Sequence, residues 1–173
     1  QISASTPKSC CANGAPRRPI PMGAVACKDE IYETVTNASP ENAIEFFHGY
    51  TYSAHPAACA AGIAALDIYE KEGLFERAQD MAPYFKEAMK SLADHELVKD
   101  IRTIGMMSGL EVHVHPGKPG FRGQEMQKAL FWNGCHIKFT GDVAIVAPPF
   151  IAEKAHVDEI VDKLRTTLDQ FVA

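Results

Sequence analysis

The chain has 173 residues, of which 46% are hydrophobic, and it carries a formal net charge of -5. That composition can fill a domain core and excludes global disorder, while the acidic balance argues against a general nucleic-acid binder, which needs a basic face. No apolar run approaches the ~20 residues that cross a bilayer, and the start of the chain lacks the basic-then-apolar order of a signal peptide, so we expect a cytoplasmic protein without membrane contact.

The cysteines and histidines do not predict a metal centre. The five cysteines are odd in number and no pair has C-x-x-C spacing, so neither a zinc site nor a disulfide framework is expected. Cys59 and Cys135 lie in apolar surroundings and are interpreted as small core residues. His113 and His115 are two residues apart and could share one strand face, but no third ligand accompanies them.

The first 53 residues contain two kinds of segment. Residues 1–19 have no apolar periodicity, hold three prolines and are expected to be irregular or disordered. Residues 20–53 carry a turn at Met22-Gly23 and a short helix over 29–35. Because this stretch would not close a core of its own, it indicates the edge of something larger.

Two helices are predicted next along the chain. The first runs from about residue 54 to 71, with Ser53 as its cap and Pro56 in the first turn, where the missing N–H has no helical partner. Gly73 ends this helix. The second helix covers about residues 75–93, where apolar residues recur at helical spacing.

From residue 98 the hydrophobic period shifts toward two, which indicates strands. The predicted elements are strands over 98–105 and 108–115, a helix over 124–134, strands over 135–141 and 143–150, and a helix over 153–172. The Gly141-Asp142 pair between the last two strands is a hairpin signal. The order from residue 54 is therefore ααββαββα, which predicts an α+β domain with helices packed on an antiparallel sheet.

The residues just before the first long helix are suited to bind a phosphate. GYTYS offers the hydroxyls of Thr51 and Ser53 and free loop N–H groups near a helix N-terminus, where the helix dipole favours negative charge. The alternative is simple capping of the helix by Ser53, and spacing alone does not decide between the two.

Three blocks of sequence carry a resemblance to a known family. They are PIPMGAVA, HGYTYSAHPAACAAGIAALDIYEKEGLFERA and KFTGDVAIVAPPFI, in that order. Together they resemble class III aminotransferases that use pyridoxal phosphate, most closely the ω-amino acid:pyruvate (β-alanine:pyruvate) type, over about residues 19–173. The resemblance implies a C-terminal small α+β domain of a fold-type I enzyme over 54–173, led by a linker helix, and a remnant of the α/β large domain over 20–53.

The resemblance also implies a cofactor site shared between subunits. In the family, the Thr of the H-G-Y/F-T-Y-S block binds the phosphate of pyridoxal 5'-phosphate in the partner protomer, together with the backbone N–H before it. Those positions are Thr51 and Tyr50 in this chain. The family forms homodimers whose active sites lie at the subunit interface and accept small amino acids and oxo acids.

A substrate-binding position is implied at Lys138. In the ω-type enzymes an Arg stands three residues before the Gly of the G-D hairpin, and this chain has Lys138 there. An Arg fork holds a carboxylate in a bidentate way, whereas Lys offers a point charge, so binding would be weaker and less oriented. Other class III members carry an Arg nearer the Pro-Pro pair, and this chain has Ile145 at that position. The alternative for Lys138 is a strand residue that points to solvent.

The N-terminal residues depart from the family pattern. The family's catalytic Lys binds the cofactor covalently and falls at Asn13, or at Ser9 if the segment holds an insertion. Lys8 is one residue away from the second position, and an amine nucleophile must lie within bond-forming reach. We therefore assign no catalytic residue. The family's phosphate loop, ring-stacking aromatic and ring-nitrogen Asp precede the matching segment.

Two functions follow from these observations. The first is a fragment of a transaminase that would move an amino group from an ω-amino acid such as β-alanine, or from an amine, to pyruvate through pyridoxal phosphate. This fragment is predicted to be inactive alone. The second is a noncatalytic α+β module that binds a partner subunit or a small acid through Lys138 and the loop around Arg122.

Overall fold

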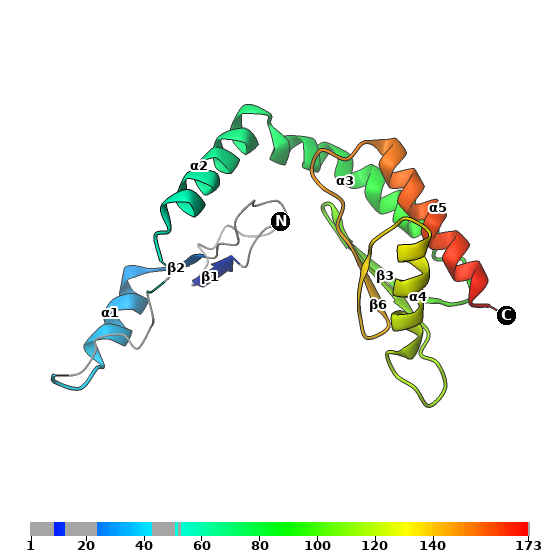
Figure 1. The fold of residues 1–173 in the computed structure, drawn as a ribbon, viewed down its shortest axis with the longest axis horizontal. Coiled ribbons are helices and arrows are strands. Elements are labelled where there is room, and N and C mark those ends of the chain that lie inside the picture. The colour runs from blue at the N-terminus through cyan, green and yellow to red at the C-terminus, as the bar shows by residue number, and fades with distance from the viewer. Residues whose placement is uncertain (1–8, 13–23, 43–50, 52, 173) are drawn as a thin grey trace. The chain divides into compact units, whose positions relative to one another are not determined.

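The computed structural model describes residues 9–12, 24–42, 51 and 53–172 (Figure 1). The chain divides into two compact units, Gln1–Lys71 and Glu72–Ala173. Within the described residues, no helix is both long and apolar enough to span a bilayer.

The described residues of the first unit form a two-stranded sheet and two helices. Strand β1 (Ser9–Ala12) pairs antiparallel with β2 (Ala24–Cys27), so four of the residues predicted to be irregular form a strand. A four-residue strand is too short to show a period, and its hydrogen bonds depend on a partner further along the chain. Helix α1 (Asp29–Asn37) extends two residues beyond its predicted end. The predicted Met22-Gly23 turn lies outside the described residues.

Helix α2 (Pro56–Lys71) begins with its proline in the first turn, as predicted. Its cap differs from the prediction. The Nδ1 atom of His55 accepts a hydrogen bond from the N–H of Ala58 at 3.3 Å, and the His55 carbonyl accepts from Cys59 at 2.9 Å. His55 therefore takes the capping role that the sequence analysis gave to Ser53, because Pro56 fixes the helix start two residues later than Ser53 requires.

The second unit is a four-stranded antiparallel sheet with three helices. Its strands lie in the order β3-β4-β6-β5, and the predicted succession of helices and strands is confirmed. The strands are β3 (Val98–Ile104), β4 (Met107–Val112), β5 (Lys138–Thr140) and β6 (Val143–Val146), and the helices are α3 (Leu74–Lys90), α4 (Phe121–Trp132) and α5 (Lys154–Gln170). Strand β4 ends at Val112, three residues before the end predicted from periodicity.

One face of this sheet makes the core. Alternate strand residues are buried and meet apolar residues of the helices, which gather along one side of the sheet in Figure 1. The fully buried positions include Leu110, Val112 and Ala144 from the strands and Phe85, Met126 and Leu164 from the helices. The opposite face of the sheet is called the open face below.

The three cysteines whose surroundings are described occupy two kinds of environment. Cys27 is exposed, whereas Cys59 and Cys135 are half-buried. Cys135 packs against the core cluster, and burial raises the pKa of its thiol above the usual value. A thiol held in its neutral form is a poor nucleophile at neutral pH, which fits a packing role.

Gly123 allows α4 to approach the hairpin between β5 and β6. A Cβ atom at this position would lie 2.0 Å from the carbonyl oxygen of Gly141 and 3.0 Å from the Phe139 ring. The obstacle is backbone rather than the end of a flexible side chain, so a larger residue must displace the helix or the hairpin.

We predict that Gly123→Ala destabilises the second unit by about 2–3 kcal/mol, as expected for overpacking against backbone. Urea unfolding followed by circular dichroism measures the change. Gly109→Ala is the matched control, because a Cβ there meets only the Val143 side chain at an ordinary 3.6 Å. Equal effects of the two substitutions would contradict the assigned close approach.

Candidate functional site

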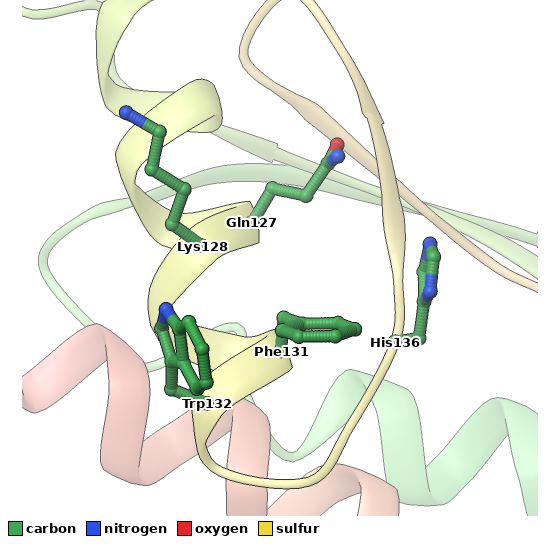
Figure 2. Close-up of a pocket in the computed structure, with 5 residues that line it drawn as sticks. All are labelled: Gln127, Lys128, Phe131, Trp132 and His136. Carbon is green, nitrogen blue, oxygen red and sulfur yellow. The ribbon is translucent and has the colours of Figure 1, made fainter.

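A pocket opens at the C-terminal end of α4 (Figure 2). Its lining residues are Gln127, Lys128, Phe131, Trp132 and His136. None of the site residues predicted from the sequence lies among them. The predicted residues occupy two other places, the turn before α2 in the first unit and the open face of the sheet in the second.

The open face carries a row of four residues that lie side by side across the strands. Arg102 of β3 pairs with Gly109 of β4, which pairs with Ile145 of β6, which in turn pairs with Lys138 of β5. Directly opposite residues in antiparallel strands point to the same side of a sheet. The row therefore has a cation at each end and small or apolar residues between them.

Lys138 and Ile145 are direct cross-strand neighbours. Their Cβ atoms are expected within about 5 Å of each other. These are the two positions at which the family resemblance places its alternative arginines. Because they share one face and one row, an arginine at either position would reach the same space. The structure thus brings together two positions that are seven residues apart in the sequence.

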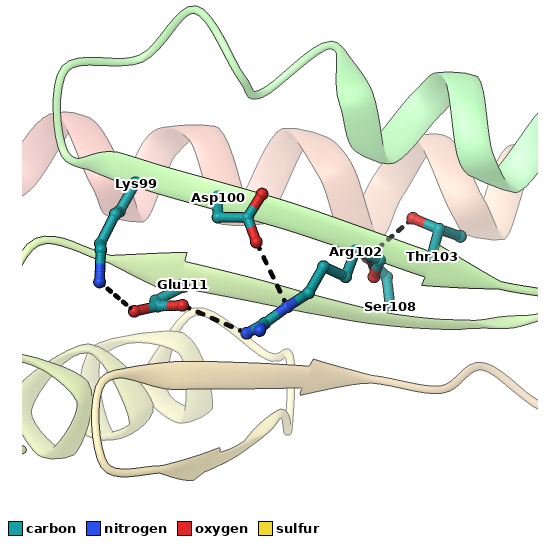
Figure 3. A network of polar contacts seen from close by, with 6 residues as sticks. All are labelled: Lys99, Asp100, Arg102, Thr103, Ser108 and Glu111. Atoms are coloured by element: carbon teal, nitrogen blue, oxygen red, sulfur yellow. Dashed lines mark hydrogen bonds and ion pairs between the residues drawn. The ribbon is translucent and has the colours of Figure 1, made fainter.

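A network of charges occupies the β3 end of the open face (Figure 3). The Glu111 carboxylate lies 2.6 Å from the Lys99 ammonium and 3.2 Å from the Arg102 guanidinium, and Asp100 lies 3.3 Å from Arg102. The hydrogen bond from Lys99 and the positive charges of Lys99 and Arg102 hold the pKa of Glu111 below its usual value, against a smaller effect of burial. Both cations at this end are therefore neutralised by carboxylates.

Lys138 differs from these cations. Its side chain is exposed at the start of β5, and within the described part of the chain no carboxylate pairs with its ammonium group. Of the two cations that end the row, Lys138 is the one whose charge is available to an external anion. A lone ammonium attracts a carboxylate without fixing its orientation.

The G-D hairpin before β6 has a structural role that the sequence analysis missed. Asp142 is only 8% exposed, and its two carboxylate oxygens accept hydrogen bonds from the N–H groups of Gly120, at 2.7 Å, and Gly123, at 2.9 Å. Its carbonyl accepts a third from the N–H of Val112 at 2.9 Å. Asp142 thus caps α4 from outside the helix, where the macrodipole favours a negative charge.

A second contact holds β5 against the same helix. The Oε1 atom of Gln127 accepts a hydrogen bond from the N–H of Phe139 at 2.8 Å. Strand β5 is at the edge of the sheet, and this side chain satisfies a backbone donor that β6 does not reach. Lys138, the neighbour of Phe139, is positioned by this contact and by its pairing with Ile145.

Arg122, His113 and His115 lie in different structural positions from those predicted. Arg122 is the second residue of α4 rather than part of a loop, and its guanidinium donates to the carbonyl of His113. His113 and His115 follow the end of β4, so they do not share a strand face. Among the residues that the structure describes, no cluster of three or more His, Cys, Asp or Glu could hold a metal ion.

Arg77 fixes the segment that follows the Pro148-Pro149 pair. Its guanidinium donates to the carbonyls of Phe150 at 3.2 Å, Ile151 at 3.2 Å and Ala152 at 3.4 Å. The centroid of the Phe150 ring also lies 5.7 Å from that of Phe75, which belongs to α3 like Arg77. No local pattern predicts these contacts, because more than 70 residues separate their partners.

Thr51 lies in a turn before α2 and is exposed. Ala54, between Thr51 and the helix, has a φ of 55°, a left-handed conformation that non-glycine residues rarely adopt and that costs about 1 kcal/mol or more. Tyr50 and Lys8 lie outside the described residues, so their predicted roles stay predictions.

Comparison with known proteins decides the family. The family model for class III aminotransferases matches residues 15–168. The chain belongs to this family. It is 43% identical over 161 residues to an omega-aminotransferase of Caulobacter vibrioides, which covers 93% of this chain and 36% of that protein. It is 40% identical over 158 residues to a beta-alanine–pyruvate aminotransferase of Pseudomonas aeruginosa, covering 91% of this chain and 34% of the relative.

Solved structures agree with this assignment. An (S)-enantioselective omega-transaminase from Thermomicrobium roseum superposes with a TM-score of 0.75 at 29% identity, covering 90% of this chain and 35% of that chain. An adenosylmethionine-8-amino-7-oxononanoate aminotransferase from Methanocaldococcus jannaschii superposes with a TM-score of 0.75 at 25% identity. The superposition covers 95% of this chain and 39% of that chain. The predicted α+β fold and the predicted family are confirmed, and the chain spans about a third of the length of these relatives.

We predict that Asp142→Ala destabilises this class III aminotransferase chain by about 2–4 kcal/mol, since it leaves two N–H groups at the start of α4 without their acceptor. Asp142→Asn keeps one oxygen acceptor and loses the charge, so its effect should be smaller. Thermal and urea unfolding measure both. A loss in Asp142→Ala no larger than that of an exposed Asp→Ala variant, such as Asp80→Ala, would contradict the capping role.

Proposed function

We propose that this chain carries the C-terminal part of a pyridoxal-phosphate-dependent ω-amino acid:pyruvate aminotransferase. An ω-amino acid such as β-alanine, or an amine, would supply the amino group, and pyruvate would receive it. Family membership and the names of the two relatives described above support this reaction class. The observation that carries the substrate assignment is the available cation at Lys138, beside an apolar Ile145.

Lys138 would bind the substrate carboxylate. The row beside it offers an apolar surface, because Ile145 and Gly109 follow Lys138 across the sheet. A short aliphatic chain with a terminal carboxylate suits such an arrangement, in which the charge meets the ammonium and the methylenes lie on apolar atoms. The single point charge predicts weaker and less oriented binding than an arginine would give.

Thr51 would bind the cofactor phosphate of a second protomer in a homodimer. Thr51 is exposed in the turn before α2, where a phosphate could reach it. Hydroxyl groups and backbone N–H groups near a helix N-terminus favour phosphate binding. The Ala58 N–H of the first turn already donates to His55. The phosphate would therefore depend on the Thr51 hydroxyl and on loop N–H groups, among which the family resemblance implies that of Tyr50, more than on the helix itself.

The bound cofactor would supply the electron sink for amino transfer, and the protein would position and protonate the substrate. We assign no lysine of this chain to covalent attachment of the cofactor. The chain by itself is therefore proposed to be inactive, and activity would require the cofactor-binding part that the longer relatives contain.

Inactivity of the isolated chain can be tested by spectroscopy. On mixing with pyridoxal phosphate we expect no stable visible absorption band of a lysine-bound cofactor, because we assign no lysine of this chain to covalent attachment of the cofactor. Borohydride reduction followed by peptide mapping measures any labelled lysine. A stable band that disappears in Lys8→Ala, but persists in Lys86→Ala, would overturn the proposed inactivity.

The substrate role of Lys138 can be tested in a chimera. Residues 20–173 would replace the equivalent part of the Caulobacter relative, which supplies the remaining two thirds of the enzyme. With β-alanine and pyruvate as substrates, we expect activity in the chimera. Lys138→Arg should lower KM for β-alanine roughly tenfold, because a bidentate charged pair replaces a point contact.

The controls separate the two proposed binding roles. Lys118→Arg makes the same chemical change away from the open face and should leave KM unchanged. Thr51→Ala should weaken cofactor binding about tenfold without changing the affinity for β-alanine, since it removes one hydrogen bond to a charged group. A chimera that folds and binds the cofactor but does not transaminate would refute the proposed function.

A further inference from the structure

We propose that the outer face of α4 is a contact surface for a second copy of this chain, with the two α4 helices antiparallel around a twofold axis. The contact would be separate from the family dimer proposed above, because it involves neither Thr51 nor the open face. Its residues form one stripe on the helix, made of Phe121, Glu125, Lys128 and Trp132.

The spacing of these residues places them on a single line. They stand at i, i+4, i+7 and i+11 of a 12-residue helix, and alternating steps of four and three keep side chains on one face. The same spacing forms the seam between paired helices in coiled coils. The opposite face of α4 contributes Met126 and Leu130 to the core, so the stripe faces away from the sheet.

Both ends of the stripe expose large aromatic side chains. Trp132 is 82% exposed and Phe121 is 40% exposed. A tryptophan with so little burial is unusual in a soluble protein, and aromatic residues are enriched in the centres of protein contacts. These two rings therefore offer apolar area that the chain itself does not cover within its described residues.

The aromatic end at Trp132 is held in a fixed arrangement. The Phe131 ring lies between Trp132, at 5.5 Å, and His136, at 5.9 Å, both edge-on, and the pocket of Figure 2 opens beside them. Rings already held by one another lose little conformational freedom on binding. The pocket is thus a preformed receptor for an apolar side chain.

The other end of the helix supplies a side chain of that kind. Phe121 packs edge-on against His115 at 5.4 Å, and the Lys118 ammonium lies 5.0 Å from its ring centre. Phe121 and the pocket residue Phe131 are ten residues apart, or about 15 Å along the helix. In an antiparallel pair, the Phe121 of each copy would meet the pocket of the other.

The charges in the middle of the stripe are complementary to the same charges on a second copy of the helix. Glu125 and Lys128 are ion-paired at 2.7 Å on the same helix. They lie symmetrically about the point between Met126 and Gln127, and Phe121 and Trp132 lie symmetrically about that same point. A twofold axis there sets Glu125 of one copy against Lys128 of the other, twice, as an isologous contact requires.

This pattern favours a second copy over other partners. One acid and one base leave the stripe without net charge, so it does not select a nucleic acid or an acidic peptide. A single short helix also gives a small contact, which places the association among weak and transient interfaces. Self-association should therefore show only at high protein concentration.

Charge reversal tests the pairing with the full chain. Glu125→Lys or Lys128→Glu alone would set like charges against each other twice across the axis and weaken self-association roughly tenfold. The double variant Glu125→Lys with Lys128→Glu should restore it. Glu159→Lys is the matched control, because it makes the same charge change in the exposed pair with Lys163 on α5 and should have no effect.

Sedimentation gives the association constant, and the single tryptophan of the chain reports the surface involved. Self-association through α4 should shift Trp132 emission to shorter wavelength as concentration rises, whereas association through another surface leaves it unchanged. Circular dichroism checks that each variant is folded. The proposal would be overturned by a Trp132 emission spectrum that does not change with concentration. It would also be overturned if the double variant is folded and self-associates no more strongly than the folded single variants.

Discussion

The carboxylate of Asp142 is the constraint on which the arrangement of the second unit depends. The N-cap residue of α4 is Gly120, which has a left-handed φ of 79° and offers no side-chain cap. Asp142 supplies the missing acceptors from the hairpin between β5 and β6. Asp142 can reach these N–H groups only because Gly123 has no side chain that would clash with the Gly141 carbonyl. One buried acid thus joins a helix start, a hairpin and, through its own carbonyl, the end of β4.

The chemistry of the open face follows from that attachment. With α4 fixed against one side of the hairpin, the other side presents Lys138 and Ile145 as neighbours. At the far end of the row, Arg102 is neutralised by Asp100 and Glu111. The sheet therefore separates a cation used for structure from one available to a ligand. An arginine at either of the two neighbouring positions would place its charge in the same region of the open face.

Much of the architecture was predictable because it rests on local patterns. The shift of hydrophobic period near residue 98, the Gly141-Asp142 turn and the placement of Pro56 in a first helical turn each gave the correct element. The predictions that proved wrong concern one local cap and two features that depend on residues distant in the sequence. His55 replaced Ser53 as the cap of α2. The strand over 9–12 depends on a partner strand, and β4 stops before His113 and His115.

The sequence by itself determined the class III aminotransferase family and the α+β order of elements, and it singled out Lys138 as the residue proposed to bind a carboxylate, because motifs and periods are properties of neighbouring residues. Only the tertiary structure decided that Asp142 is a buried cap, that Arg77 holds three carbonyls, and that Lys138 is unpaired within the described residues while Arg102 is not. Hydrogen bonds and ion pairs of this kind depend on distances between residues far apart in the chain, and no spacing along the sequence contains those distances.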